Sequence, residues 1–230
     1  MTLFSLYDQK LIRLTDDQGN TFSGVADVLP AEYCLHEYGR EEEAISLGDF
    51  LIYRSQIKKV DILPTYEEAM AAIPLGRYRH FKGNEYEVIA LAKHSETEET
   101  MVIYKALYGD GGIWCRPADM WNETVTRDGK TYRRFYRLDL IKRVEKYERL
   151  FDEAVSSRGP EKLRLLEAYY TTGQWREDYE ADERGELPPD LKRGVLSQDG
   201  LYNLLEGSKK QRRCLRLAGE READRENIFT

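Results

Sequence analysis

The sequence predicts an α+β protein built from three modules, two small and β-rich and the third an α-helical bundle. Three observations support this. Short apolar stretches separated by Gly-containing turns fill residues 1–63 and 75–137, as expected for strands. After residue 138, apolar residues recur three and four positions apart, which is the period of a helix. Pro64 and Pro74 enclose a short segment between the two β-rich modules, and 230 residues suffice for modules of this size.

The first module, residues 1–63, is predicted to be a small β-barrel. Two strands flank the Asp17–Asn20 turn, a third covers Tyr33–Tyr38, and two more follow the acidic loop GREEEA. This pattern resembles the Sm-like barrel. Sm-like RNA sites use an Asn in one loop and an Arg-Gly pair in another. Here Arg54 is followed by Ser and the other loop is acidic, so this module is not expected to bind RNA.

Residues 64–74 are predicted to form a short helical linker, with Thr65 and Glu68 at the spacing of a capping box. The module that follows, residues 75–137, is predicted to be a curled, SH3-like sheet. Its two clearest hairpin signals are Asp110-Gly111-Gly112 and Asp128-Gly129. The predicted strands are Arg77–Phe81, Tyr86–His94, Met101–Tyr108, Ile113–Arg116, Glu123–Thr126 and Thr131–Arg137.

Residues 138–218 are predicted to form the helical bundle, and residues 219–230 a charged tail. An apolar stripe begins at Leu140 and continues after the Gly159-Pro160 turn, where Pro160 suits the first position of a helix. Gly173 ends this helix, a shorter helical segment follows, and Ser197 is placed to cap the last helix.

Composition narrows the class of protein. A hydrophobic content of 41% with 33% charged residues indicates a folded protein with a highly charged surface. The net charge of −7 argues against a nonspecific nucleic-acid coat, although residues 71–137 carry a small positive charge. The apolar runs are too short to span a bilayer and the start does not resemble a secretory signal. Three cysteines without a CxxC pair predict reduced thiols in the cytoplasm and no zinc site, and no cofactor is expected.

Basic and aromatic side chains are concentrated in the middle module. Arg77, Arg79, His80 and Lys82 fall within six residues, and alternation puts the two arginines on one face of their strand. Together with Arg116, they predict a cationic patch beside the aromatic residues Trp114 and Tyr104. Arginine binds phosphate and an aromatic face stacks a base, so nucleotide binding is one interpretation. The alternative is that basic residues on an edge strand serve solubility and block strand pairing.

His94 and Glu96 follow at the end of a predicted strand. A histidine beside a carboxylate can read polar groups of a ligand or act as a general acid and base. The alternative is turn chemistry, in which Ser95 and Thr97 bond to backbone N–H groups. Turn chemistry accounts for the two hydroxyl residues better than for His94, so a site role is favoured for the histidine.

Two other features are interpreted as structural. Cys115 lacks the sequence neighbours of a catalytic cysteine and is expected to be a buried, inert thiol. Asp178 and Asp182 of the segment DYEADE share a helix face, with Arg176 and Arg184 close enough to neutralise them. A salt-bridged, solvated helix face is therefore preferred over a metal site. The basic run at residues 209–216 is followed by acidic residues and reads as part of a mixed-charge tail.

Two segments resemble bacterial families without an assigned function. Residues 74–125 carry Y-R-H-F-K-G, H-S-E-T and W-x-R-P, the motifs of a short β-domain family. Residues 140–206 carry W-x-x-D-Y-E-x-D-E followed by L-K-R-G-V-L-S, the motifs of a helical family. Neither resemblance implies a known reaction.

The first hypothesis from the sequence is a non-catalytic cytoplasmic binding protein whose middle module holds a nucleotide-like anion or a nucleic-acid end. A hydrolase-type enzyme with His94 as the base is one alternative, and a protein–protein scaffold is another. No membrane partner is expected. The ligand, any protein partner and the oligomeric state are left open.

Overall fold

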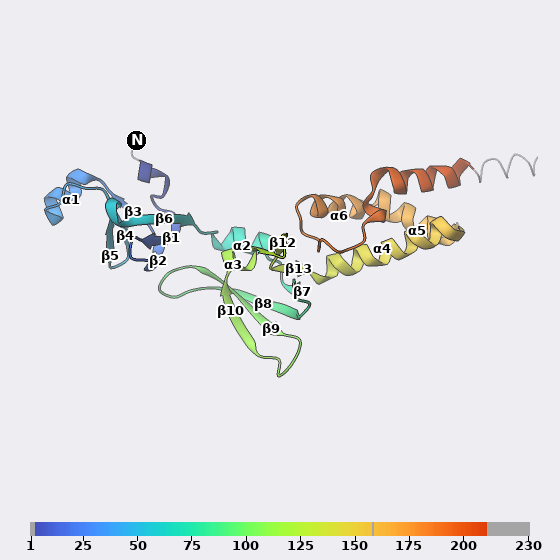
Figure 1. Ribbon diagram of the computed structural model, residues 1–230, viewed down its shortest axis with the longest axis horizontal. Coiled ribbons are helices and arrows are strands. Elements are labelled where there is room, and N and C mark those ends of the chain that lie inside the picture. The colour runs from blue at the N-terminus through green and yellow to red at the C-terminus, as the bar shows by residue number, and fades with distance from the viewer. Residues whose placement is uncertain (1–2, 158, 211–230) are drawn as a thin grey trace, which may run out of the picture. The chain divides into compact units, whose positions relative to one another are not determined.

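The computed structural model describes residues 3–157 and 159–210 (Figure 1). The chain divides into two compact units, Met1–Val125 and Thr126–Thr230, which are described separately. The first unit holds most of the strands and the second is mainly helical, so the predicted C-terminal helical region is confirmed.

The N-terminal part of the first unit contains two three-stranded antiparallel sheets. One has the order β2-β1-β6 and the other β3-β4-β5. Ile12 and Leu14 of β1 are fully buried and pack with Ile45 and Ile52 of the second sheet, because alternate residues of a strand face the same side. The elements are η1 (Leu3–Leu6), β1 (Leu11–Asp16), β2 (Thr21–Val25), β3 (Asp27–Leu29), β4 (Ala44–Leu47), β5 (Phe50–Tyr53), η2 (Arg54–Gln56) and β6 (Ile57–Ile62).

The strand predicted over Tyr33–Tyr38 is wrong, because this segment is the helix α1 (Ala31–Tyr38). Pro30 stands at its N-cap, and Gly39 ends it in the left-handed conformation, φ 71°, where its N–H bonds the carbonyls of Cys34 and Leu35. Buried Cys34 anchors the helix. Within residues 3–63, the strands form two sheets, and no closed barrel is found among the described residues. The Sm-like barrel therefore stays a prediction.

The helix α2 (Tyr66–Ala72) follows, with the predicted capping box: Glu68 N–H donates to the Thr65 hydroxyl over 3.2 Å, and Thr65 N–H donates to the Glu68 carboxylate over 2.9 Å. The strands after it form an antiparallel sheet in the order β10-β9-β8-β7, visible in green below α2 and α3 (Figure 1). These strands are β7 (Gly76–His80), β8 (Glu85–Lys93), β9 (Thr100–Ala106) and β10 (Ile113–Pro117), and α3 (Ala118–Trp121) follows.

One face of this central sheet is buried. Tyr78, Val88, Val102 and Tyr104 line it, and Trp121 from α3 packs against them, 1% exposed. The ring of Trp121 meets those of Tyr78 and Tyr104 edge-on at centroid distances of 5.3 and 5.0 Å. Arg13 of β1 bonds to Asp119 of α3 at 2.5 Å and to Glu99 at 2.7 Å. The same unit therefore joins its first sheet to the loop before β9 and to α3.

The second unit begins inside β11 (Thr124–Arg127), which turns through Asp128 and Gly129 into β12 (Lys130–Arg133) and is followed by β13 (Phe135–Arg137). Its helices are α4 (Leu138–Ser157), α5 (Pro160–Thr171) and α6 (Gln174–Glu183). A short 3-10 helix, η3 (Gly194–Leu196), comes before a helix at 198–210 that Ser197 caps by accepting Gly200 N–H over 3.2 Å. The predicted tail at 219–230 lies outside the described residues.

No helix among residues 3–157 and 159–210 is both long and apolar enough to cross a membrane.

Candidate functional site

The predicted site residues of the middle module lie at opposite ends of the central sheet. Leu107 N–H donates to Glu85 C=O over 3.0 Å, so the β7–β8 turn and the β9–β10 hairpin share one end. The turn at 94–99 joins β8 to β9 at the other end. A strand of the length of β8 spans on the order of 25 Å. His80 and Lys82 are therefore too far from His94 and Glu96 to contact one small ligand together.

The two aromatic residues singled out by the sequence have different environments. Tyr104 is 7% exposed and lies edge-on to Tyr86 and Trp121 at 5.6 and 5.0 Å, so it belongs to the core of the sheet. Trp114 is directly across from Tyr104 in β10 but is 60% exposed. Trp114 is thus the only one of the three tryptophans with an open ring, since Trp121 and Trp175 are 1% and 6% exposed.

The indole of Trp114 lies against Gly112. A Cβ placed on Gly112 would come within 3.2 Å of the indole Nε1, which is closer than side chains normally approach. The glycine therefore lets the ring lie along the end of the hairpin while much of the ring stays open to solvent. Arg116 is two residues further along β10, so alternation puts it on the same face as Trp114, and it is half-buried.

The strand β10 is last in the strand order of the sheet, and Ile113, Trp114 and Cys115 are exposed on it. Ala106 N–H donates to Gly112 C=O over 3.0 Å, so Gly112 points its backbone groups toward β9. In an antiparallel ladder the next residue points away, which directs the backbone of Ile113, Cys115 and Pro117 outward. Pro117, which lacks an N–H, thus stands where β9 needs no donor.

The arginines of β7 behave as the alternation predicts. Arg77 is exposed on the face opposite the buried Tyr78, and its register neighbours are Glu87 and, one strand on, Lys105. Arg79 is half-buried and 3.5 Å from the Glu85 carboxylate. This face therefore carries alternating charges rather than a purely cationic patch, which is the arrangement that favours cross-strand pairing.

Both histidines of the module accept backbone hydrogen bonds in turns. His80 Nδ1 accepts from Lys82 N–H over 3.2 Å. His94 Nδ1 accepts from Glu96 N–H over 3.3 Å and from Thr97 N–H over 3.2 Å. Each imidazole accepts hydrogen bonds from backbone N–H groups just after a strand and so stabilises the turn, as Asp or Asn side chains do in other turns. Turn chemistry thus accounts for His94 as well as for its hydroxyl neighbours.

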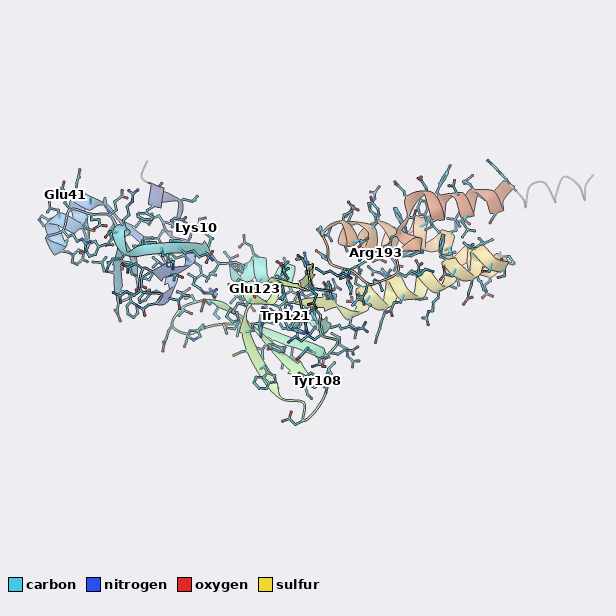
Figure 2. The ribbon with its side chains drawn as sticks, viewed as in Figure 1. Lys10, Glu41, Tyr108, Trp121, Glu123 and Arg193 are labelled. Carbon is cyan, nitrogen blue, oxygen red and sulfur yellow. The ribbon has the colours of Figure 1, made fainter. Side chains whose placement is uncertain are left out.

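A tyrosine pair that the sequence did not single out lies at the end of the sheet with His80. The Tyr86 and Tyr108 hydroxyls are 2.6 Å apart, and Figure 2 labels Tyr108 at the tip of the β9–β10 hairpin. Burial, followed by the hydrogen bond to Tyr108, raises the pKa of Tyr86 to about 12. The pair depends on the register that sets Tyr86 opposite Ala106, which the sequence alone does not give.

The expectation of a buried thiol at Cys115 is wrong: Cys115 is exposed, while Cys34 is the buried cysteine. The physical reason is that β10 is the last strand of the sheet, and Cys115 is on the face opposite Trp114 and the core. The sequence around Cys115 is apolar enough for burial, but burial depends on a neighbouring layer that these described residues do not supply on that face.

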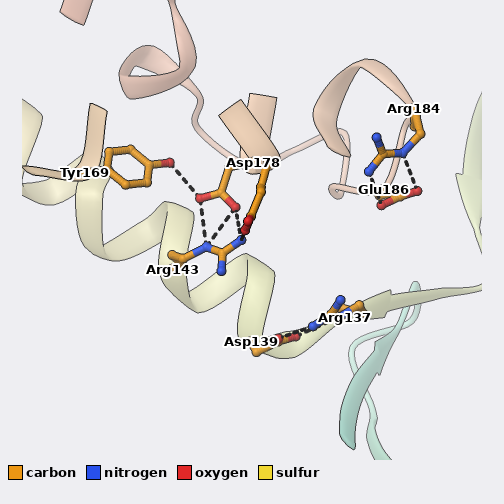
Figure 3. A network of polar contacts seen from close by, with 8 residues as sticks. Arg137, Asp139, Arg143, Tyr169, Asp178, Arg184 and Glu186 are labelled. Atoms are coloured by element: carbon orange, nitrogen blue, oxygen red, sulfur yellow. Dashed lines mark hydrogen bonds and ion pairs between the residues drawn. The ribbon is translucent and has the colours of Figure 1, made fainter. Parts of the chain in front are cut away.

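In the second unit, the DYEADE segment is salt-bridged with other partners than predicted, and the predicted solvated face is wrong for Asp178. Asp178 is fully buried between helices (Figure 3). Arg143 of α4 donates to its carboxylate from Nε, at 2.8 Å from Oδ1 and 3.0 Å from Oδ2, and from Nη2. The Tyr169 hydroxyl donates to the same carboxylate over 2.7 Å. Asp182 pairs with Arg193 at 3.1 Å. Arg184 pairs with Glu186 at 2.9 Å rather than with the cluster.

This network shifts the pKa values of its members in the directions expected for a buried ion pair. The hydrogen bond to Asp178 raises the pKa of Arg143. Burial, helped by the bond to Asp178, raises the pKa of Tyr169 well above its ordinary value. Both shifts favour a charged pair with a neutral phenol, an arrangement that joins α4, α5 and α6. The acidic motif of the helical unit is therefore a packing element.

A cavity of about 350 Å³ lies on the same unit, lined by α4 and the segment before η3. Glu148 on its wall is 4% exposed; its Oε2 accepts Val195 N–H over 2.6 Å, and Lys192 Nζ is 3.4 Å from its Oε1. The residues that line the cavity are Glu145, Glu148, Arg149, Asp152, Leu191 and Lys192. Across the described ranges, no group of three His, Cys, Asp or Glu side chains could hold a metal ion.

Of the predicted site, the structure brings together Trp114 and Arg116 on β10, above buried Tyr104. It gathers Arg79, His80 and Lys82 at one end of the sheet and His94 with Glu96 at the other, and both Arg77 and Arg79 lie on the face opposite Trp114. Exposed Trp114 with half-buried Arg116 on the same face of an edge strand is the candidate site that remains.

Comparison with known proteins assigns both modules to families of unknown function. Residues 76–137 match the model "Protein of unknown function (DUF1653)", and residues 139–214 match "Domain of unknown function (DUF4298)". No curated protein matches the chain. A crystal structure of a DUF1653 protein from Bordetella bronchiseptica is 38% identical, covering 29% of this chain and 87% of that chain, with a TM-score of 0.27. The resemblance to two families without an assigned function is thereby confirmed, and through its middle module the chain belongs to the DUF1653 family.

Proposed function

We propose that the protein is a non-catalytic binding protein whose central sheet takes a nucleotide-like anion at β10. The observation that carries the proposal is the exposed indole of Trp114, 60% open, with Arg116 two residues away on the same face. An open indole offers a face on which a base stacks, for about 1–3 kcal/mol per base. A guanidinium offers paired donors to phosphate oxygens.

The surroundings support recognition more than catalysis. Trp114 lies across from buried Tyr104, and its indole lies against Gly112, so the ring is oriented before any ligand arrives. The Nδ1 of His94, the expected base, accepts hydrogen bonds from two backbone N–H groups of its own turn. This arrangement gives no specific support to a hydrolase.

The shared chemistry of the ligand is a planar base next to a phosphate, present both in free nucleotides and at the end of a nucleic acid. Because Trp121 and Trp175 are buried, a base stacked on Trp114 is expected to quench the exposed part of the intrinsic fluorescence. The test is a titration with AMP, with ATP and with a short 5′-phosphorylated oligonucleotide. Saturable quenching by the mononucleotides supports a small-molecule ligand, and quenching by the oligonucleotide alone supports a nucleic-acid end.

Two variants make the titration specific. Trp114→Ala removes the fluorescent reporter, so its affinity is measured by isothermal titration calorimetry and is expected to fall at least tenfold. Arg116→Gln is expected to weaken binding at least tenfold as well, and both keep a melting temperature close to that of the wild type. Arg77→Gln is the matched control, since Arg77 is exposed on the opposite face of the same sheet. Equal affinity of wild type and Trp114→Ala for every probe, or no saturable quenching at all, contradicts the proposal.

A further inference from the structure

The edge strand β10 has a backbone arrangement that a second copy of the same strand can complete. Ile113, Cys115 and Pro117 direct their backbone groups away from β9, and within the described residues the sheet ends at this strand. Unpaired edge groups beside exposed apolar side chains are a template for strand addition, and natural proteins usually cover or charge them. Ile113 and Trp114 are 64% and 60% exposed here.

We propose that two copies of this chain pair antiparallel along β10 about a two-fold axis at Cys115, and that the binding site contains Trp114 of one copy and Arg116 of the partner subunit. This inference rests on the proposed function and adds to it the source of the second ligand contact. The pairing surface is isologous, as the interfaces of most homodimers are.

The register follows from the strand itself. Cys115 is the central residue of Ile113–Pro117, so an axis through it pairs every residue of the strand. Cys115 then exchanges hydrogen bonds with its own counterpart, and Ile113 N–H donates to the carbonyl of the partner subunit's Pro117 on each side. Pro117 accepts there through its carbonyl and lacks an N–H to donate, which suits the end of a paired segment.

Charge selects the same register. An axis through Arg116 would set two guanidinium groups opposite each other, which is destabilising. An axis through Cys115 instead sets Arg116 opposite the open indole of the partner subunit's Trp114, where a cation over the ring is attracted by roughly 0.5–2 kcal/mol. The pairing thus buries the exposed indole edge and builds the aromatic–cation site from both copies.

The first experiment tests the pairing without any ligand. The experiment uses a Cys214→Ser background. The two remaining cysteines are then Cys34, which is buried, and Cys115, which is exposed. Mild oxidation is expected to give a disulfide-linked dimer, because residues opposite each other in such a pair have Cα atoms within the roughly 4.4–6.8 Å that a disulfide spans. Cys115→Ser in the same background is expected to form no covalent dimer under oxidation.

A matched control fixes the register. Ile113→Cys combined with Cys115→Ser moves the thiol to a position opposite Pro117 of the partner subunit, where no disulfide can form. Crosslinking of this control as efficiently as of the parent protein, or a monomeric mass for the oxidised parent protein over the whole concentration range, overturns the proposal.

The second experiment tests whether the site is shared. Trp114→Ala and Arg116→Gln are each expected to bind AMP poorly alone. Mixed in equal amounts, half of the dimers combine the two variants, and each such dimer has one complete site, so about a quarter of the wild-type binding capacity returns. Trp114→Ala mixed with the double variant is the control and should recover nothing.

The outcomes separate this inference from the proposed function. A Cys115 crosslink without nucleotide binding by the wild type retains the pairing and removes the function and the shared site. Nucleotide binding by the wild type with no recovery in the mixture retains the function and overturns the shared site.

Discussion

The carboxylate of Glu148 occupies the space that a side chain at Gly194 would need. A Cβ on Gly194 would be 2.8 Å from Glu148 Oε1, inside the distance of any real contact. The same carboxylate accepts the N–H of Val195 over 2.6 Å, and the Trp175 indole donates to Val195 C=O over 2.9 Å. The glycine of L-K-R-G-V-L-S and the tryptophan of W-x-x-D-Y are therefore parts of one joint between α4, α6 and η3.

Gly194→Ala should destabilise the helical unit by about 1–3 kcal/mol, because the added methyl displaces the buried carboxylate and strains its bond to Val195. Chemical denaturation measures this change. Gly207→Ala is the matched control: Gly207 lies in the helix at 198–210 with nothing within 4 Å of its Cβ position, so alanine should stabilise by about 0.4–1 kcal/mol. Equal free energies of unfolding for the two variants would contradict the close contact between Gly194 and the Glu148 carboxylate.

Asp178→Ala should cost about 3–5 kcal/mol, because it leaves Arg143 and the Tyr169 hydroxyl without their common acceptor among packed helices. Asp182→Ala, four residues on in the same helix, should cost about 0–1 kcal/mol, since its pair with Arg193 is more exposed. Thermal melts of the two variants make the comparison, and a double-mutant cycle with Arg143→Met isolates the pair. Similar losses for both aspartates would argue against the buried network.

The stability of the first unit should fall as the pH rises from 10 to 12. The pKa of Tyr86 is about 12 in the fold, against about 10 when unfolded, so in this window the folded state holds a proton that the unfolded state has lost. The stabilisation is complete below pH 10 and is lost as the pH passes the folded pKa. Denaturation at several alkaline pH values should show a shallower decline for Tyr86→Phe, and identical slopes for both proteins would contradict it.

His94→Ala should destabilise the first unit by about 0.5–1 kcal/mol, because the N–H groups of Glu96 and Thr97 lose their acceptor. His94→Asn should recover most of the loss, since an amide oxygen accepts in such turns. Nucleotide binding at Trp114 should be unchanged in both variants. Loss of binding in His94→Asn with full stability would instead return His94 to the binding site.

Much of the fold was predictable because it depends on local chemistry. The turns at Gly83, Asp110–Gly112 and Asp128-Gly129 need positive φ or small residues, and β7 to β10 begin and end within two residues of the predicted bounds. The capping box at Thr65, Pro160 at the start of α5 and Ser197 at the last helix are likewise set by neighbours in sequence.

The two wrong predictions, the strand at Tyr33–Tyr38 and the buried Cys115, both depend on tertiary packing rather than on local chemistry. Residues Tyr33–Tyr38 are predicted to be a strand, but the helix over Ala31–Tyr38 is decided by Pro30, Gly39 and the burial of Cys34. Cys115 is expected to be buried because it lacks the sequence neighbours of a catalytic cysteine, yet a sheet has to have a last strand, and only strand order shows which one it is.

The sequence by itself determined where most strands, turns and helices occur, since these follow from periodicity and from residues within about four positions of each other. The tertiary structure alone decided which charges meet and which rings stay open. It paired Asp178 with Arg143 rather than with Arg176 or Arg184, buried Tyr104, and left Trp114 exposed at the edge of the sheet. The physical reason is that burial and ion pairing depend on residues distant in sequence, whose proximity arises only when the sheets and helices pack.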